Sequence, residues 1–184
     1  LMRELNLFIK RIIDIFGSLV GIILLSPIFI IIAFSIKITS KGPVFFKQER
    51  LGKYGKIFKI IKFRTMVVNA EKIGTGLIVR TENDNRITKV GKFLRATSLD
   101  ELPQLFNVLI GDMSLVGPRP PVPYHPYKYL EYSDIQKKRF IMKPGMTGLA
   151  QVTVRNSVSW DERIRVDVEY VYKFNIWFDI KIIV

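Results

Sequence analysis

The sequence of 184 residues contains no cysteine and only one histidine, His125. Without cysteine the chain has no disulfide bond, no thiolate zinc site and no cysteine nucleophile, and one histidine cannot supply a multi-histidine metal site. A histidine-centred catalytic triad is also disfavoured. The sequence lacks the Gly-x-Gly-x-x-Gly fingerprint of dinucleotide-binding folds and the Walker-type Gly-Lys-Ser/Thr motif. Any catalysis must therefore use carboxylates, hydroxyls, lysine, arginine or a hard cation.

Acidic residues are scarce relative to basic ones. Lysine and arginine number 29 against 16 aspartates and glutamates, a formal net charge of +13, while 48% of the residues are hydrophobic. A strongly basic chain favours an anionic partner such as nucleic acid, an anionic lipid surface or a phosphorylated substrate. Basic and apolar character together favour the membrane surface over nucleic acid, and the length allows one compact domain.

A run of 22 residues, 15–36, carries no charge. As a straight helix it extends about 33 Å, enough to cross the hydrocarbon core of a membrane. Pro27 near its centre clashes with the carbonyl of Ile23 and predicts a kink, while Ser26 can hydrogen-bond back to a freed carbonyl. Basic residues flank both ends, and short basic flanks stay on the cytoplasmic side. These residues favour a re-entrant helix that bends at Ser26-Pro27, with a through-going transmembrane helix as the alternative.

The stretch 37–64 contains nine basic residues and one acidic residue. Most of the lysines are expected to hold the protein on anionic headgroups, at about 1 kcal/mol each. Two short apolar clusters separated by glycines predict strands at 44–46 and 57–63 that are joined by a turn. Lys62 and Arg64 occupy alternate positions and therefore one face of the second strand, which suits binding a diphosphate.

Helical periodicity follows two adjacent carboxylates, Asp100 and Glu101. Apolar residues recur after them at i, i+3, i+4 and i+7, Pro103 belongs in a first helical turn, and Gly111 is a natural stop. A helix is therefore predicted to begin near Leu99 or Asp100, with both acids at its N-terminus. One interpretation is structural, because acids at that position cap free N–H groups and complement the helix dipole, contributing about 0.5–2 kcal/mol.

The neighbourhood of the two carboxylates favours chemistry instead. Arg95 lies one turn upstream, and the N-terminus of a helix can bind phosphate. Downstream, the proline-rich segment around Pro118 and Arg119 is typical of a rigid loop that presents one guanidinium. Carboxylate, arginine and rigid loop together indicate a phosphoryl-transfer site, in which Mg²⁺ bound by a carboxylate would screen a diphosphate.

The C-terminal part predicts one strand and one helix. Tight turns lead into a strand-like stretch at 149–154, and Ser159 with Glu162 resembles a capping box that opens a helix extending to about Tyr172. The acidic residues of this helix, among them Asp167, are interpreted as a solvated or ion-paired face.

Seven motifs in order resemble those of the bacterial sugar transferase family, the monotopic phosphoglycosyl transferases that begin glycoconjugate assembly on a polyprenyl phosphate carrier. The resemblance covers nearly the whole chain. The motifs are Ser26-Pro27, Gln48-x-Arg50-x-Gly52, Phe58-Lys59-x-x-Lys62-Phe63-Arg64-Thr65-Met66, Ser98-Leu-Asp-Glu-Leu-Pro-Gln104, Gly111-Asp-Met-Ser114, Gly117-Pro-Arg-Pro120 and Pro144-Gly-x-Thr-Gly-Leu-Ala-Gln151.

The resemblance implies that Asp100 is the nucleophile, that Glu101 is its partner and that Mg²⁺ binds nearby with Asp100 as a ligand. It also implies that Arg119 and the Pro118 loop hold phosphate, and that Ser26-Pro27 makes the re-entrant bend. The substrate-binding residues expected from all these observations are Lys62, Arg64, Arg95, Pro118, Arg119, Gln151 and Arg155.

Two positions depart from the family pattern. Lys143 precedes Pro144 where arginine is expected, and Thr153-Val154-Arg155 replaces the more usual Asn-Gly-Arg. These departures concern the nucleotide or sugar pocket and not the chemistry.

The expected fold is α+β and mainly helical, with a re-entrant membrane helix hairpin over residues 1–40 and a small membrane-associated catalytic domain over 41–184. The expected activity is transfer of a sugar 1-phosphate from a UDP-sugar to undecaprenyl (polyprenyl) phosphate, with release of UMP through a covalent phosphosugar–Asp intermediate. It takes place on the cytoplasmic face of the bacterial inner membrane, without a nucleic acid partner and compatibly with a homo-oligomer. The alternative is a non-enzymatic, membrane-tethered binder of nucleic acid or anionic lipid, which predicts steep salt dependence and no role for Asp100.

Overall fold

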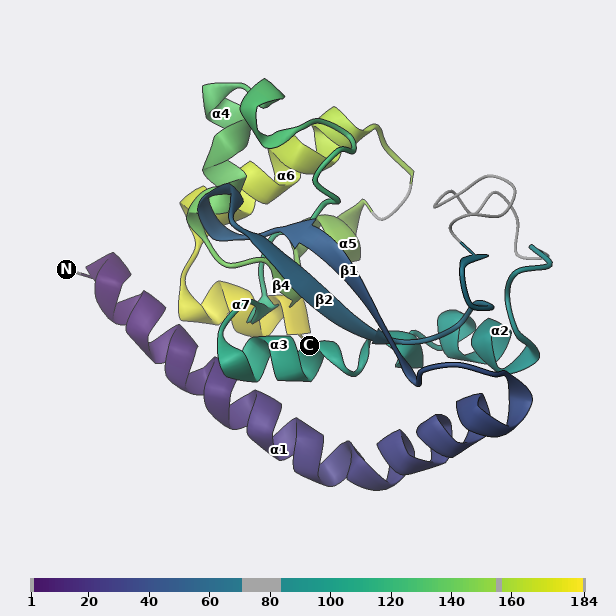
Figure 1. Ribbon diagram of the computed structural model, residues 1–184. Coiled ribbons are helices and arrows are strands. Elements are labelled where there is room, and N and C mark those ends of the chain that lie inside the picture. Colours follow the sequence, from purple (N-terminus) through teal and green to yellow (C-terminus); the bar gives the residue numbers. More distant parts are fainter. Residues whose placement is uncertain (1, 71–83, 155–156, 184) are drawn as a thin grey trace. The chain divides into compact units, whose positions relative to one another are not determined.

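The computed structural model describes residues 2–70, 84–154 and 157–183. Helices predominate in these ranges and the strands pair into two small sheets, β1 with β2 and β3 with β4, so the α+β, mainly helical prediction is confirmed (Figure 1). The elements are α1 Met2–Thr39, β1 Phe45–Leu51, β2 Ile57–Phe63, α2 Lys89–Ala96, α3 Gln104–Ile110, β3 Ser114–Val116, α4 Asp134–Lys137, β4 Gly145–Thr147, α5 Leu149–Thr153, α6 Trp160–Lys173 and α7 Ile176–Ile183, with 3₁₀ turns at Lys53–Gly55, Leu99–Glu101, Tyr129–Glu131 and Lys138–Ile141.

The chain divides into two compact units, each assembled from separate stretches of sequence. Unit 1 comprises Leu1–Ile22, Gln48–Ile60 and Gln104–Val184, and unit 2 comprises Ile23–Lys47 and Ile61–Pro103. Helix α1 and the β1–β2 hairpin contribute residues to both units. The functional division into 1–40 and 41–184 stays a prediction.

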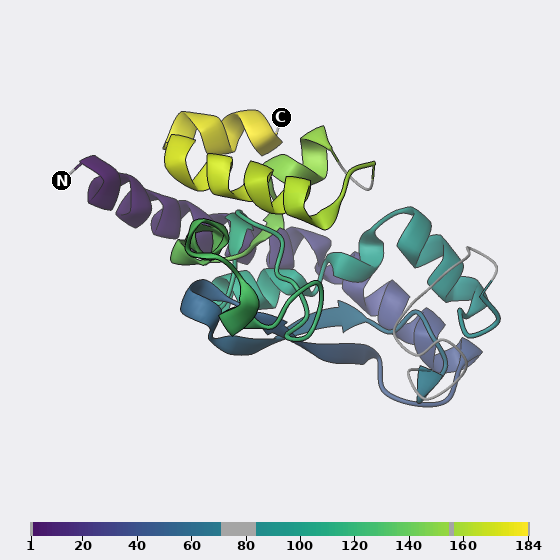
Figure 2. The same cartoon turned by 90° about the horizontal axis from the view of Figure 1, so that it is seen from above.

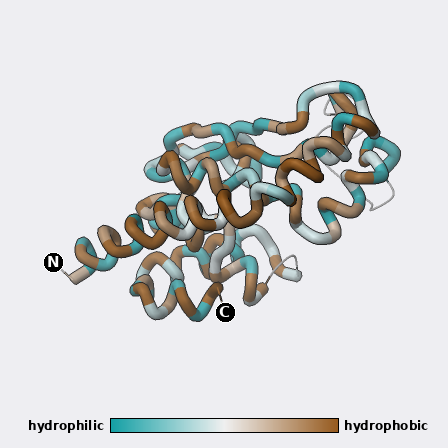
Figure 3. Tube along the Cα trace, turned by 90° about the horizontal axis from the view of Figure 1, so that it is seen from below, coloured by the Kyte–Doolittle hydropathy of each residue, from teal (hydrophilic) through white to brown (hydrophobic). Residues whose placement is uncertain are grey.

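Helix α1 is long and apolar enough to cross a membrane, by its length and composition. Figure 3 shows apolar residues recurring along its whole length. The helix includes Pro27, which cannot donate a hydrogen bond to the carbonyl of Ile23. The Ser26 hydroxyl donates to that same carbonyl at 2.8 Å and so replaces the missing bond, as the sequence predicts. The re-entrant path through Ser26-Pro27 stays a prediction.

The N-terminal part of α1 is fixed in unit 1 by buried polar side chains. The Lys10 ammonium lies 2.5 Å from Asp179 of α7. One oxygen of Asp14 accepts hydrogen bonds from the Ser114 hydroxyl and the Leu115 amide, both at 2.9 Å. Charged residues at the start of an apolar helix therefore serve as its attachment points in this unit.

The core of unit 1 surrounds the short parallel pair of β3 and β4, in which Ser114 lies opposite Gly145 and Val116 opposite Thr147. Helices α6 and α7 follow one another along the C-terminal part of the unit (Figure 2) and supply much of its apolar packing. One buried cluster consists of Val116, Met142, Tyr170, Val171, Phe174 and Ile182, and a second of Leu51, Tyr132, Phe140, Ile164 and Val168.

Unit 2 places α2 tightly against the end of β2. Thr88 caps α2 by accepting a hydrogen bond from the Gly91 amide at 2.9 Å, and its own amide donates to the carbonyl of Thr65 at 3.0 Å. Gly91 is required here because a Cβ on it would lie 2.0 Å from that carbonyl oxygen. The core of the unit is a cluster of Ile32, Ile36, Phe63 and Leu94, against which Phe29, Val44, Val90, Leu99 and Leu102 pack.

The hairpin and the C-terminal helix are confirmed, but the first strand, predicted at 44–46, extends over Phe45–Leu51. Strands β1 and β2 flank a 3₁₀ turn at Lys53–Gly55. The Ser159 hydroxyl caps α6 by accepting a hydrogen bond from the Glu162 amide at 3.2 Å. Local cap and turn chemistry is the signal that made both predictable.

The strand predicted over 149–154 is wrong. These residues form the helix α5, in which the amides of Gln151 and Val152 donate to the carbonyl of Gly148. The strand that pairs with β3 is instead Gly145–Thr147, just upstream. The strand-like appearance of the stretch was misleading because its leucine, alanine and glutamine are good helix formers.

The helix predicted to begin near Leu99 or Asp100 is also corrected. The structure has a 3₁₀ turn at Leu99–Glu101 and begins α3 at Gln104, after Pro103. Leu102, just before the proline, keeps helical backbone angles (φ −51, ψ −38), so the break lies at Pro103, which has no N–H to donate to a preceding carbonyl. Gly111 ends the segment with φ +101, as predicted.

Candidate functional site

Asp100 and Glu101 lie on a 3₁₀ turn that follows α2 in unit 2. The chain reverses at Ser98, whose φ of 57 places it in the left-handed region, and the Glu101 amide donates to the Ser98 carbonyl at 3.1 Å. Leu99 and Leu102 on either side pack against the core cluster of the unit. The turn thus anchors its apolar residues and leaves the two carboxylates half-buried at its surface.

Lys62 of β2 lies beside this turn. Its ammonium is 2.7 Å from an oxygen of Glu101, and the two side chains are 17% and 24% exposed. A half-buried ion pair is screened less than an exposed one, so it fixes both side chains. The pair joins the end of β2 to the turn that carries Asp100.

The surroundings of Asp100 act on the pKa of its carboxyl in opposite directions. Burial raises the pKa of its carboxyl, and the adjacent Glu101 raises it further, while Lys62 and Arg95 act in the opposite direction. Desolvation makes a carboxylate more reactive toward an electrophile, and nearby cations keep it ionised and favour anionic substrates. Lys62, Arg95, Asp100 and Glu101, predicted as site residues, are thus brought together in unit 2.

Arg64 has a different environment from Lys62, although the strand pattern predicts both on one face. Its buried guanidinium donates to the carbonyls of Ser40 and Lys41 and to the Ser40 hydroxyl. These are the carbonyls that follow the C-terminus of α1, where a cation is favourable. The structure therefore gives Arg64 a structural role at the end of α1.

The turn with Asp100 and Glu101 offers the kind of oxygen ligands that Mg²⁺ uses. No group of three or more histidine, aspartate or glutamate side chains gathers for metal binding within 2–70, 84–154 and 157–183. Mg²⁺ does not need such a cage, because it is usually held by one or two carboxylates together with substrate phosphates and water. Asp100 and Glu101 are adjacent oxygen donors of that kind.

In unit 1, four consecutive carbonyls of the proline-rich loop, residues 118–121, each accept a hydrogen bond. Their donors, in chain order, are the Gly145 amide at 3.0 Å, the Arg139 guanidinium at 3.0 Å, the Arg50 guanidinium at 3.1 Å and the Leu51 amide at 2.9 Å. Three of the four residues are prolines and have no N–H to donate. The loop is therefore rigid, as the sequence predicts.

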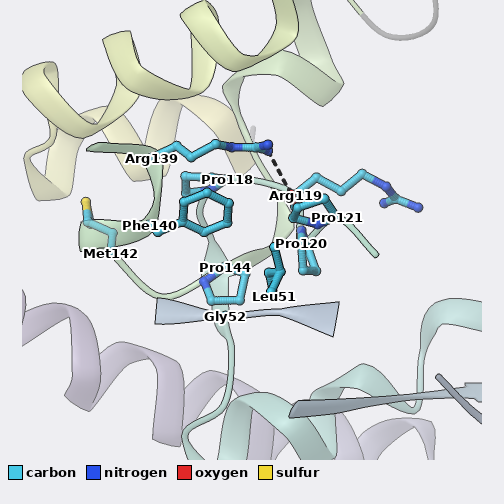
Figure 4. A pocket seen from close by; sticks show the side chains of 10 residues that line it. All are labelled: Leu51, Gly52, Pro118, Arg119, Pro120, Pro121, Arg139, Phe140, Met142 and Pro144. Carbon is cyan, nitrogen blue, oxygen red and sulfur yellow. Dashed lines mark hydrogen bonds between the residues drawn. The ribbon is translucent and has the colours of Figure 1, made fainter. Parts of the chain in front are cut away.

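The Arg119 side chain leaves this rigid loop toward solvent. Figure 4 shows it extending away from Pro120, Pro121 and the other residues that line a small pocket. The cavity volume is only about 10 Å³, far below the roughly 300–1,000 Å³ of typical ligand pockets. The pocket is too small for a ligand of that kind, and a phosphate-binding role for the exposed Arg119 guanidinium stays a prediction.

Two further predicted residues belong to the segment after β4. The Gln151 side chain donates to the carbonyl of Met146 at 2.9 Å and so supports the turn between β4 and α5. Arg155 lies outside the described residues. Pro118, Arg119 and Gln151 thus belong to unit 1, whereas the turn that carries Asp100 and Glu101 belongs to unit 2.

Sequence reasoning missed Arg139. Its guanidinium lies 2.5 Å from Asp167 of α6, and both side chains are almost fully buried, at 2% and 3% exposed. Asp167 falls on the apolar stripe of α6 that includes Ile164, Val168 and Val171, and a carboxylate in such a stripe signals a buried partner. The identity of the partner, 28 residues away, has no local signal.

Residues 5–184 match the family model described as bacterial sugar transferase. A galactosyl transferase of Streptococcus agalactiae is 45% identical over 188 residues, which cover 97% of this chain and 41% of the relative. A UDP-glucose:undecaprenyl-phosphate glucose-1-phosphate transferase of Klebsiella pneumoniae is 47% identical over 189 residues, 99% of this chain and 40% of the relative. An undecaprenyl-phosphate galactose phosphotransferase of Salmonella typhimurium is 41% identical over 196 residues, 100% and 40% respectively. The chain spans about two fifths of the length of these curated relatives.

Proposed function

This chain belongs to the bacterial sugar transferase family, and we propose that it transfers a sugar 1-phosphate from a UDP-sugar to undecaprenyl phosphate, with release of UMP. The names of relatives at 41–47% identity support the substrate class. The observation that carries the proposal is the half-buried Asp100 carboxylate. Burial raises its pKa, and two nearby cations, Lys62 and Arg95, act to lower it. That is the environment of a carboxylate nucleophile directed at a phosphate.

The reaction proceeds in two balanced steps. An oxygen of Asp100 attacks the phosphorus that bears the sugar, and the bond from that phosphorus to the bridging oxygen of UMP breaks. UMP leaves with the bonding electrons, and an acyl phosphate that joins Asp100 to the phosphosugar remains. The phosphate of the lipid acceptor then attacks the same phosphorus and releases the Asp100 carboxylate. Two steps suit a water-soluble donor and a membrane-bound acceptor, which need not be bound together.

The cations of unit 2 stabilise charge that develops on the transferring phosphoryl group. Lys62 and Arg95 are the two that act on Asp100. Lys62 also holds Glu101, which orients the turn. Arg119 supplies a guanidinium for a substrate phosphate, since a planar guanidinium matches two phosphate oxygens.

Mg²⁺ would be held by Asp100 with Glu101 beside it. When bound, it would neutralise charge on the donor diphosphate. Lys62 would then orient Glu101, and Arg95 would favour the anionic form of Asp100.

The protein associates with the cytoplasmic face of the inner membrane through α1, in this proposal. Most apolar side chains of α1 are exposed, for example Phe16, Ile23, Leu24 and Ile30 at 62–71%. Exposed apolar surface on that scale is stable only against lipid or another protein. The basic stretch that follows α1 suits anionic headgroups, and the re-entrant path through Ser26-Pro27 keeps both basic flanks on one side.

A covalent adduct tests the proposal. Full-length protein incubated with UDP-sugar and Mg²⁺, without acceptor, is expected to release up to one equivalent of UMP and to carry the mass of the phosphosugar on the Asp100 peptide. Asp100→Asn keeps the size of the side chain and removes the nucleophile, so folded variant should give neither product. Substantial turnover by folded Asp100→Asn would overturn the covalent mechanism and favour direct attack by the lipid phosphate.

The same assay separates the enzyme from a non-enzymatic binder of anionic surfaces. The binder predicts lipid binding that weakens steeply with salt and is unchanged by Asp100→Asn. The enzyme predicts UMP release that depends on both the UDP-sugar and Asp100.

A further inference from the structure

The backbone of the Arg119 loop is held by one buried side chain at the residue that carries the exposed guanidinium. One nitrogen of Arg139, Nη2, donates both to the carbonyl of Arg119 at 3.0 Å and to a carboxylate oxygen of Asp167 at 2.5 Å. Figure 4 shows the Arg139 guanidinium directed at the Arg119 backbone. Asp167 thus fixes Arg139, and Arg139 fixes Arg119.

The buried ion pair of Arg139 and Asp167 is not expected to increase the stability of the fold by itself. Arg139 and Asp167 are 3% and 2% exposed, and within the described parts of the chain the Nε and Nη1 atoms of Arg139 have no hydrogen-bond partner. Burying two charges is costly, and replacing such a pair by apolar residues is often neutral or stabilising. Unpaired buried donors add to the cost. The pair is therefore better explained by the contact that Arg139 makes with the Arg119 backbone.

Each backbone carbonyl of the loop has its own donor, and Arg139 is the donor to the carbonyl of Arg119. The carbonyls of Pro118, Pro120 and Pro121 are bonded by other donors. The carbonyl of Arg119 sets the peptide plane next to the Cα from which its side chain departs. Because a displacement of about 1 Å at a reacting group can cost about a hundredfold in rate, a contact that fixes this peptide plane can influence catalysis through the position of the guanidinium.

We propose that Arg139 and Asp167 are positioning residues of the transferase, which fix the Arg119 backbone so that its guanidinium meets a substrate phosphate. The proposal rests on the proposed function and adds to it a buried pair that touches no substrate. Its effect on catalysis passes entirely through Arg119.

A double-mutant cycle tests this pathway. Arg139→Lys keeps a positive charge for Asp167 but replaces the planar guanidinium, whose Nη2 donates to both acceptors, by an ammonium on a side chain of different geometry. In full-length protein with Arg119 present, we expect kcat/KM for the UDP-sugar or for the lipid phosphate to fall by about 10- to 100-fold, as expected for loss of one positioned charge contact. In the Arg119→Ala background, Arg139→Lys should change the same constant by less than twofold.

A purely structural role predicts a different cycle. Arg139→Lys would then lower activity by the same factor with and without Arg119, in proportion to the loss of folded protein. All constants are therefore normalised to the folded fraction from gel filtration and thermal melting. Equal losses in the two backgrounds overturn the positioning proposal.

Two additional variants keep the test decisive. Asp167→Asn preserves size and hydrogen bonding, and it replaces Arg139→Lys in the cycle if the latter does not fold. Arg165→Lys is the matched control, because Arg165 lies on the same helix in an exposed pair with Glu162 at 3.4 Å. It should leave all constants unchanged, whereas a loss comparable to that of Arg139→Lys overturns the proposal.

The failure of this proposal can be told apart from failure of the proposed function. If Arg119→Ala retains wild-type kcat/KM for both substrates, positioning through Arg119 is wrong, while the adduct on Asp100 still establishes transfer. If no UMP is released and no adduct forms in wild-type protein with any UDP-sugar tested, the proposed function itself is wrong.

Discussion

Two carboxylates with raised pKa values, Asp100 and Asp167, differ in what surrounds them. Asp100 is half-buried on a surface turn and is influenced by two cations and a neighbouring Glu101. Asp167 is fully enclosed and is held by one guanidinium, that of Arg139. The first can receive a substrate and the second cannot, so the same direction of pKa shift accompanies a proposed nucleophile in one place and a buried support in the other.

The titration of Asp167 is expected to appear in the pH dependence of stability. Burial raises the pKa of its carboxyl from 3.8 to about 6. Between these values the folded protein binds a proton that the unfolded chain does not, so the unfolding free energy falls as pH rises from about 4 to 6, by up to about 1.4 kcal/mol per unit, and then levels off. Chemical denaturation of wild type and Asp167→Asn at several pH values measures this.

The variant should lose that part of the slope, because asparagine does not titrate. Glu162→Gln is the control on the same helix, since Glu162 is far more exposed in its ion pair. Identical slopes in wild type and Asp167→Asn would show that Asp167 titrates normally.

Arg64 provides a second prediction at the residue scale. Its guanidinium donates to two carbonyls and a hydroxyl at the end of α1. Arg64→Lys keeps the charge and loses the fork, so it should lower the unfolding free energy by about 2 kcal/mol. The KM of the folded fraction for UDP-sugar should not change. An increased KM without a loss of stability would instead support the diphosphate role expected from the strand pattern.

The elements of unit 2 depend on one close approach. Helix α2 can lie against the end of β2 only because Gly91 has no side chain, and the turn with Asp100 follows directly from α2. The core residues Phe63 and Leu94 join the same two elements. A change in how α2 packs is therefore transmitted along the backbone to the carboxylates.

Gly91→Ala should destabilise the protein markedly. Its Cβ would lie 2.0 Å from the backbone oxygen of Thr65, which cannot move aside as a side chain can. Overpacking of this kind costs about 1–3 kcal/mol or more. Thermal unfolding of the purified protein measures the loss, and the folded fraction should also show reduced UMP release.

Gly17→Ala is the matched control. A Cβ on Gly17 would meet only the tip of the Leu115 side chain, at 2.9 Å, and alanine favours a helix by about 1 kcal/mol over glycine. Its melting temperature should stay close to that of wild type. Equal destabilisation by the two substitutions would contradict the account of Gly91.

Elements with local signals were predictable and those set by distant contacts were not. Ser159 marks the start of α6 and Gly111 the end of α3 because caps and left-handed residues act within a few positions. The stretch 149–154 satisfies both a strand and a helix pattern, and the choice was made by Gly145–Thr147, which pairs with β3. Arg139 was missed for the same reason, since its partner Asp167 is remote in sequence.

At the scale of the whole chain, charge and hydropathy work together. The net charge of +13 is combined with a helix whose apolar side chains are largely exposed. Within unit 1, three polar residues of α1, Lys10, Asp14 and Ser18, are buried against protein. The usual distribution of a water-soluble helix is thus reversed over this part of α1, as expected where lipid is the surrounding medium.

The re-entrant path of α1 is expected to place residues before 15 and after 36 on the same side of the membrane. Because the 184 residues contain no cysteine, Leu5→Cys and Lys56→Cys each introduce the only thiol in this part of the protein. Both positions are exposed in the structure. A membrane-impermeant maleimide should label neither variant in intact cells and both after lysis, while a cysteine in a periplasmic marker protein is labelled throughout. Labelling of only one variant in intact cells would establish a through-going helix. Pro27→Ala restores the N–H that donates to the carbonyl of Ile23, so it should shift part of the population toward that labelling pattern and lower UMP release in proportion.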